Sequence, residues 1–310
     1  MKKYAQVANF NVVFGEDEKP MLECFDSIVF PALTSGITKK FGDNELLFKN
    51  IEIKQSGSGF LLIGKIVKKT VLEVKSDLNE KGELVEKDEK YSAAPYSTFV
   101  INLRNHRMIY MLNQKGSPSL ANFRSAIKNV FDIYIRQRNR ELEEGKKLDY
   151  AITNVVGIPS VKSLDELLDN VDKVNSLMLR FYPLNGDMDY TEVFGLLSND
   201  LRKELDSKTG AITFNSPKSM AGIKKILAKA AGTIEAVIKV VTKDRSKATL
   251  KNYELAEKYE IDVDEMADEG TKQLVEMTSN IETLNYTNEM HDDIYERNKE
   301  KIIPFTNGKR

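Results

Sequence analysis

Acidic and lysine residues occur in two triplets whose spacing could hold a metal ion. Glu52-Ile53-Lys54 follows Asp43, and Glu73-Val74-Lys75 lies in the next apolar run. In a magnesium nuclease, an acidic residue followed by an E-x-K pair on a strand would hold the metal and orient water. In a chain with 46 basic and 47 acidic residues, such triplets also arise by chance on exposed strand faces. A magnesium-dependent nuclease is therefore kept as an alternative function.

The other candidate catalytic patterns are incomplete. Gly59 to Lys65 has the spacing of a phosphate-binding loop, but Ile66 follows where a hydroxyl residue would hold magnesium, so the run is interpreted as a strand. His106 and His291 have no second ligand at metal spacing, and both are expected to be solvated polar residues. Cys24 lies alone in an apolar stretch, which favours a buried and unreactive thiol. We therefore expect no catalytic residue, no metal and no cofactor, and favour a non-enzymatic protein.

Basic residues gather in one segment of the C-terminal half. Between Ser216 and Lys251, nine lysines and arginines stand against two acidic residues, a net charge of +7 in a chain whose total is −1. Lysines on adjacent elements could line a groove of phosphate spacing and bind nucleic acid with little sequence preference. The candidate nucleic-acid-binding residues are Lys224, Lys225, Lys229, Lys239, Lys243, Arg245, Lys247 and Lys251.

The segment that follows is strongly acidic. From Asn252 to Glu269, eight acidic residues stand against one lysine, a net charge of −7. A solvated surface on which the two segments neutralise each other is therefore an equal alternative to a nucleic-acid interface. In that case the basic residues would support stability and would not bind nucleic acid.

The apolar patterns that must position these residues predict an α+β fold. In the first half, alternation predicts strands, and Ser117-Pro118 begins a helix whose apolar residues keep a helical spacing to about Arg140. Residues 76–90 include nine charged residues and are interpreted as an exposed excursion or long loop. The predicted strands are 4–14, 46–55, 60–74, 98–103 and 108–112. They form a mixed or antiparallel sheet with a covering helix.

The second half mixes strands and helices without strict alternation, which favours α+β over a doubly wound sheet. We predict an N-terminal α+β domain at residues 1–148 and a smaller α+β domain at 149–310. The predicted strands are 150–158, 176–182 and 234–241. The predicted helices are 163–171, 190–205, 218–230, 247–258 and a long C-terminal helix at 272–299.

The predicted C-terminal helix carries an apolar stripe that needs a partner surface, within the chain or from a second copy. The stripe consists of Leu274, Met277, Ile281, Leu284 and Tyr295. A homodimer is expected on this ground. The single cysteine, and the absence from the sequence of an apolar run of about 18 residues, predict a cytoplasmic protein without direct membrane insertion.

The order of these motifs resembles the RexA phage-exclusion proteins of lambda-type prophages, over about residues 93–258. The resemblance is carried by the hairpin Tyr96 to Ile101 with return strand Met108 to Tyr110, by Gly116-Ser117-Pro118, by Val193-Phe194-Gly195, and by Val237-Ile238-Lys239 with the basic residues after it. That family is understood as DNA-binding, dimeric and active in defence against infecting phage. The resemblance implies that Lys239, Lys243, Arg245 and Lys251 match basic positions in its C-terminal half.

Together, the residues and the resemblance lead us to expect a non-enzymatic, cytoplasmic, homodimeric protein that binds double-stranded DNA. We expect it to act as a sensor or effector in phage defence or abortive infection, with a partner protein encoded nearby. A magnesium-dependent nuclease is the first alternative. A protein-interaction module that does not bind nucleic acid is the second.

Overall fold

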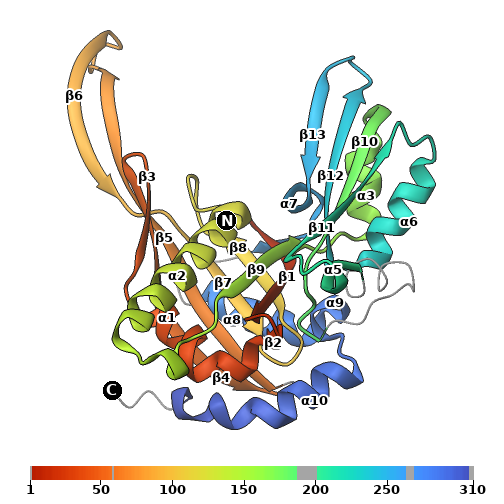
Figure 1. The fold of residues 1–310 in the computed structure, drawn as a ribbon. Coiled ribbons are helices and arrows are strands. Elements are labelled where there is room, and N and C mark those ends of the chain that lie inside the picture. Colours follow the sequence, from red (N-terminus) through yellow and green to blue (C-terminus); the bar gives the residue numbers. More distant parts are fainter. Residues whose placement is uncertain (1, 58, 187–200, 263–268, 307–310) are drawn as a thin grey trace.

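The computed structural model describes residues 2–57, 59–186, 201–262 and 269–306. Within these residues the chain has the α+β fold expected from the sequence, with two separate β-sheets (Figure 1). Sheet 1 has ten strands and sheet 2 has four, and every strand pair in both sheets is antiparallel.

Sheet 1 has the strand order β14-β1-β8-β7-β5-β4-β3, with β2 and β9 paired to β1 and β6 paired to β5. Its strands are β1 (Lys2–Phe14), β2 (Lys19–Pro20), β3 (Thr38–Phe41), β4 (Asn44–Ser56), β5 (Gly59–Leu78), β6 (Leu84–Ala93), β7 (Tyr96–Asn102), β8 (Arg107–Leu112), β9 (Ala151–Gly157) and β14 (Lys258–Asp262). The β4–β5 and β7–β8 hairpins were both predicted, and both are confirmed.

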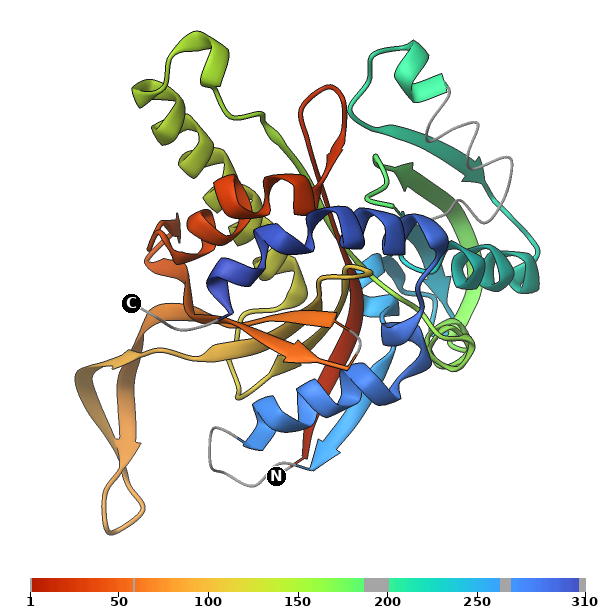
Figure 2. The same ribbon diagram turned by 90° about the horizontal axis from the view of Figure 1, so that it is seen from below.

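Helices cover both faces of sheet 1 (Figure 2). One face packs against α2 (Leu120–Glu141), where Phe123 makes edge contacts with Phe10, Phe48, Phe99 and Tyr110. The helical segments η1 (Met21–Cys24), η2 (Phe25–Val29), α1 (Phe30–Thr34) and α10 (Glu289–Asn298) complete this core. The other face packs against α8 (Glu269–Asn280) and α9 (Glu282–Asn285).

Sheet 2 has the strand order β11-β10-β12-β13. Its strands are β10 (Val171–Phe181), β11 (Gly210–Asn215), β12 (Ile234–Thr242) and β13 (Lys247–Lys251). The helices α3 (Val161–Leu168) and α6 (Met220–Ala230) pack on one face through Leu164, Leu168, Ile223 and Leu227. Ser160 caps α3 and Ser219 caps α6, because each hydroxyl accepts a backbone N–H of the first turn.

The chain that builds sheet 2 is inserted into the edge of sheet 1. β9 pairs with residues 8–14 of β1, and β14 pairs with residues 2–6 on the same side. The two strands therefore lie end to end, and the amide of Glu257 donates to the carbonyl of Ile158 at 2.8 Å where they meet. We call residues 158–257 the inserted lobe, and the remainder the body.

Buried polar residues of the body hold the inserted lobe in place. Asn11 on β1 donates to the carbonyl of Pro183, and Arg107 donates to the carbonyl of Ala231. Asn252 in α7 (Asn252–Leu255) joins both parts, because its amide donates to Gly157 at 2.6 Å and its oxygen accepts from Ala236 at 3.0 Å. A single division after residue 148 would place β9 and β14 with the second domain, whereas both strands belong to sheet 1.

Several predicted elements differ from the structure. Residues 247–258 were predicted as a helix but form strand β13, the short helix α7 and the start of β14. The excursion at residues 76–90 is exposed as expected, but it is a β-hairpin and not a loop. The C-terminal helical region is divided into α8, α9 and α10. Most of the predicted helix 190–205 lies outside the described residues, which include only α5 (Arg202–Glu204).

The apolar stripe of the C-terminal region is covered within the chain. Leu274 and Leu284 are fully buried and Tyr295 is nearly so, against strands of sheet 1. The stripe was expected to need a partner surface, either within the chain or from a second copy. The structure provides this surface within the chain. Homodimer formation stays a prediction without support from this stripe. No helix within the described residues is long and apolar enough to cross a membrane.

Candidate nucleic-acid interface

One face of sheet 2 is left open. Because side chains alternate along a strand, the residues between the core positions point away from α3 and α6. At one edge this face is bordered by the N-terminal turns of α2, by β9 and by α7 (Asn252–Leu255). The open face consists of Ala211, Thr213 and Asn215 of β11, Lys173, Ser176, Met178 and Arg180 of β10, Glu235, Val237, Lys239 and Val241 of β12, and Lys247, Thr249 and Lys251 of β13.

Three lysines of β12 and β13 stand on the open face without a carboxylate partner. Lys239 lies opposite Thr249, and Lys247 and Lys251 lie at the two ends of β13. All three are exposed, and none forms an ion pair with a carboxylate in the described part of the chain. Their charges are therefore available to an external anion such as a phosphate group.

A groove runs between the open face and α2. It has a volume of about 450 Å³ and is lined by Arg124 and Lys128 of α2, Arg180 of β10, and Glu235 of β12 and Lys251 of β13. The groove brings two cations from the body beside the cations of the open face. No pattern in the sequence indicates this juxtaposition, because residues 124 and 235 are far apart along the chain.

Glu235 is the only carboxylate on the open face as defined above, and it is already neutralised. Arg124 donates to its two oxygens at 2.6 and 3.1 Å, and the hydroxyl of Tyr182 donates at 2.6 Å. Arg180 lies 3.7 Å from the same carboxylate. Burial alone would raise the pKa of Glu235, but these hydrogen bonds and positive charges outweigh it and keep the pKa below its ordinary value. The open face is therefore net positive.

The turn between β12 and β13 presents two further cations. The Asp244 carboxylate accepts from the amide and hydroxyl of Ser246 and from the hydroxyl of Thr242, which lowers the pKa of Asp244 to about 2. Arg245 adopts a left-handed backbone conformation with φ of 67°. Lys243 and Arg245, on either side of Asp244, are exposed at the tip of the hairpin.

The remaining predicted basic residues lie on the other side of sheet 2. Lys224, Lys225 and Lys229 are on α6, which packs against the core face of the sheet. Lys224 forms an ion pair with Asp165 of α3 at 2.6 Å, whereas Lys225 and Lys229 are exposed. The structure therefore brings Lys239, Lys247 and Lys251 together on one face and separates them from the three lysines of α6.

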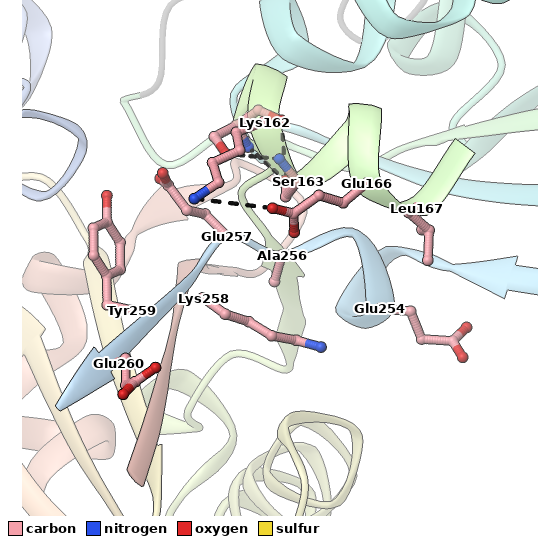
Figure 3. Close-up of a pocket in the computed structure, with 11 residues that line it drawn as sticks. Lys162, Ser163, Glu166, Leu167, Glu254, Ala256, Glu257, Lys258, Tyr259 and Glu260 are labelled. Atoms are coloured by element: carbon pink, nitrogen blue, oxygen red, sulfur yellow. Dashed lines mark hydrogen bonds and ion pairs between the residues drawn. The ribbon is translucent and has the colours of Figure 1, made fainter. Parts of the chain in front are cut away.

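The acidic segment forms a surface of its own. Glu254, Glu257 and Glu260 line a pocket of about 390 Å³ beside α3, where Lys162 lies 3.9 Å from Glu166 (Figure 3). Glu260 also pairs with Lys2 of β1. In the described part of the chain, Glu254, Glu257 and Glu260 form no ion pair with a lysine of the open face. The mutual neutralisation considered for the two segments is thus not formed by these residues.

Other candidate residues occupy structural positions. Glu52 pairs with Lys54 at 2.9 Å on β4, and Glu73 pairs with Lys90 at 2.9 Å on the β5–β6 hairpin. In the described ranges no three His, Cys, Asp or Glu residues gather as a metal site would require. Gly59 to Lys65 is part of β5, as the apolar run predicts. Half-buried Cys24 has a thiol whose pKa is raised to about 11, mainly by burial.

The prediction that the two histidines are solvated was wrong. His106 and His291 are both fully buried, and their rings meet edge to face with centroids 5.8 Å apart. The β7–β8 turn that carries His106 is covered by α10, which carries His291. No local pattern around this polar turn indicates that a helix nearly 200 residues later covers it.

No protein-family model matches this chain, and no curated protein matches it.

Proposed function

We propose that this protein binds double-stranded nucleic acid, most naturally DNA, through the phosphates and with little preference for sequence. The observation that carries the proposal is the open face of sheet 2, on which Lys239, Lys247 and Lys251 lack carboxylate partners. Phosphate contacts of this kind release counterions, and they give affinity without base readout.

The side chains of the open face favour backbone contacts over base stacking. Proteins that bind single strands through a sheet use exposed aromatic residues on which bases stack. None of the fourteen residues of the open face is aromatic. A duplex, whose bases are already stacked, is therefore the better match for this surface.

We further propose that binding serves phage defence, with the protein as a sensor or effector and not as an enzyme. This part of the proposal rests on the resemblance to the RexA phage-exclusion proteins. The basic residues that carry the resemblance are Lys239 of β12 and, after that strand, Lys243, Arg245 and Lys251. They lie on the open face or on the hairpin tip beside it.

The test compares two double variants that remove the same charge from opposite faces of sheet 2. Lys239→Ala with Lys247→Ala changes the open face, and Lys225→Ala with Lys229→Ala changes α6. Binding of two unrelated duplexes is measured by fluorescence anisotropy between about 50 and 200 mM salt. We expect the open-face variant to bind both duplexes more weakly and to flatten the log–log salt slope by about two units.

The α6 variant serves as the matched control and should keep the affinity and slope of the unchanged protein. Both variants should melt at the same temperature as the parent, because exposed charges contribute little to stability. If the two variants lose affinity for the duplexes equally, the open face is not the interface. If the unchanged protein does not bind duplexes at low salt, the proposed function is wrong.

A further inference from the structure

The hairpin of β5 and β6 extends from the body as a two-stranded arm (Figure 1). Residues 70–78 of β5 pair with β6 and with no other described strand. We call residues 70–93 the arm. The arm and the β12–β13 hairpin extend from the same side of the molecule (Figure 1). A two-stranded ribbon in water has little stability of its own, so a free arm of this length needs a surface to pack on.

The two faces of the arm differ in chemistry. One face is a ladder of ion pairs in which Glu73 meets Lys90 at 2.9 Å, Lys75 meets Asp88 at 2.5 Å and Lys87 meets Asp77 at 3.0 Å. These charges satisfy one another within the ribbon. The polar face therefore needs no partner.

The other face of the arm is exposed and mostly apolar, with Glu89 opposite Val74 and Glu86 opposite Ser76. Leu72 lies opposite Tyr91, and Leu78 lies opposite Leu84. Their exposed fractions are 56, 53, 64 and 75% respectively. Because Leu72, Val74 and Leu78 are separated by even numbers of residues along β5, they share one face. Exposed apolar patches on a ribbon of this kind mark a contact with another protein surface.

The charge of the arm identifies the surface that fits it. The arm has four lysines and seven acidic residues, a net charge of −3, which opposes nucleic acid as its partner. The open face of sheet 2 has the complementary character. It presents apolar Met178, Val237 and Val241 between Lys239, Lys247 and Lys251.

The buried area distinguishes two arrangements in which a second copy could cover the arm, namely arm-to-arm and arm-to-sheet packing. Nine residues of strand span about 30 Å and two strands are about 10 Å wide, so one arm face covers about 300 Å². Two arms packed on each other would bury about 600 Å², well below the ~1,200 Å² at which stable interfaces begin. Two equivalent arm-to-sheet contacts would bury about 1,200 Å² and reach that threshold.

We propose that the protein forms a two-fold dimer in which the apolar face of each arm lies on the open face of sheet 2 in the other copy. The contact is isologous, since each copy gives one arm and one sheet. The arm then covers the lysines to which nucleic acid is proposed to bind. Nucleic acid and the second copy compete for one surface, a consequence that rests on the proposed function, whereas the dimer itself does not.

The first test is sedimentation velocity of the full chain at micromolar concentration. We expect a dimer for the parent and a monomer for Leu72→Ser with Leu84→Ser, which remove apolar side chains that are already exposed. Val71→Ser is the matched control, because Val71 is 50% exposed on the ion-paired face, and it should stay dimeric. Lys239→Glu with Lys247→Glu should also give monomer, whereas Lys225→Glu with Lys229→Glu should not. A monomeric parent, or a dimer that survives the leucine substitutions, overturns the proposal.

The second test locates the contact directly. A photocrosslinking amino acid at position 84 should attach to peptides of residues 234–251 from a second, isotope-labelled copy. Attachment to the arm of that copy would establish arm-to-arm packing and refute the arm-to-sheet dimer. Addition of duplex DNA should reduce the crosslink. If DNA binds the parent without reducing the crosslink, the competition is wrong, and if DNA does not bind at all, the proposed function fails while the dimer stands.

Discussion

Arg124 on α2 and Glu235 on β12 form a two-point hydrogen-bonded ion pair, with donor–acceptor distances of 2.6 and 3.1 Å. The pair joins the body to the inserted lobe across the groove. Its side chains are 31 and 14% exposed, so water screens it only in part. The same contact neutralises the carboxylate of the open face and fixes the position of α2 beside sheet 2.

Replacement of Arg124 should destabilise the protein, because Glu235 would keep a half-buried charge with fewer donors. We expect Arg124→Met to lower the free energy of unfolding by about 1–3 kcal/mol, measured by urea denaturation. Arg136→Met is the control on the same helix, since exposed Arg136 donates to the backbone carbonyl of Asp132 one turn away. The control should change stability by less than about 0.5 kcal/mol. Equal effects of the two substitutions would show that the pair does not stabilise the contact between the lobes.

The same pair predicts a pH dependence. The pKa of Glu235 is lowered in the folded protein relative to about 4.3 in an unfolded chain. A lowered carboxyl pKa contributes stability that is present above the unfolded pKa and is lost as the pH falls through the folded value. The difference in unfolding free energy between the parent and Glu235→Gln should therefore be constant near neutrality and shrink below about pH 4. A difference that grows as the solution is acidified would contradict the assignment.

Gly157 provides a test of the junction between the body and the inserted lobe. A Cβ atom at this position would lie 2.7 Å from the Cβ of Ala256 and 2.7 Å from the carbonyl oxygen of Asn252, which is backbone and cannot move aside alone. Gly157→Ala should cost about 1–3 kcal/mol of stability by overpacking. Gly145→Ala is the control, because nothing lies within 4 Å of its Cβ position. Thermal melting of both variants compares them, and a neutral Gly157→Ala would show that the lobes are not held this closely.

Local patterns predicted much of the body. The long alternating runs of β1 and the β4–β5 hairpin, and the helical spacing of α2 after its Ser and Pro start, are signals within one element. β13 was missed because its own alternating pattern is short. Its alternation of Lys247, Thr249 and Lys251 with Ala248 and Leu250 lasts five residues and runs into the helical turn of α7, so the helical spacing dominated the pattern.

The candidate site was predictable only in its charge. The sequence identified Lys239, Lys247 and Lys251 as basic, but the face of a sheet that a helix covers depends on packing between elements. The lysines of α6 were therefore grouped with residues that lie on the opposite face. Arg124 and Arg180 were missed because their importance depends on Glu235, and no local spacing links these three positions.

The end-to-end arrangement of β9 and β14 affects the order in which the chain folds as it is made. Strand β1 cannot form all of its strand pairs until residue 262 has left the ribosome, because β14 pairs with residues 2–6 of β1. The strands of sheet 2 pair with one another within residues 171–251, so the inserted lobe has all its partners earlier. Contacting residues of that lobe are closer together in the sequence, which also favours faster folding. During synthesis, the part of the molecule with the proposed binding surface therefore completes its sheet before the body that holds it.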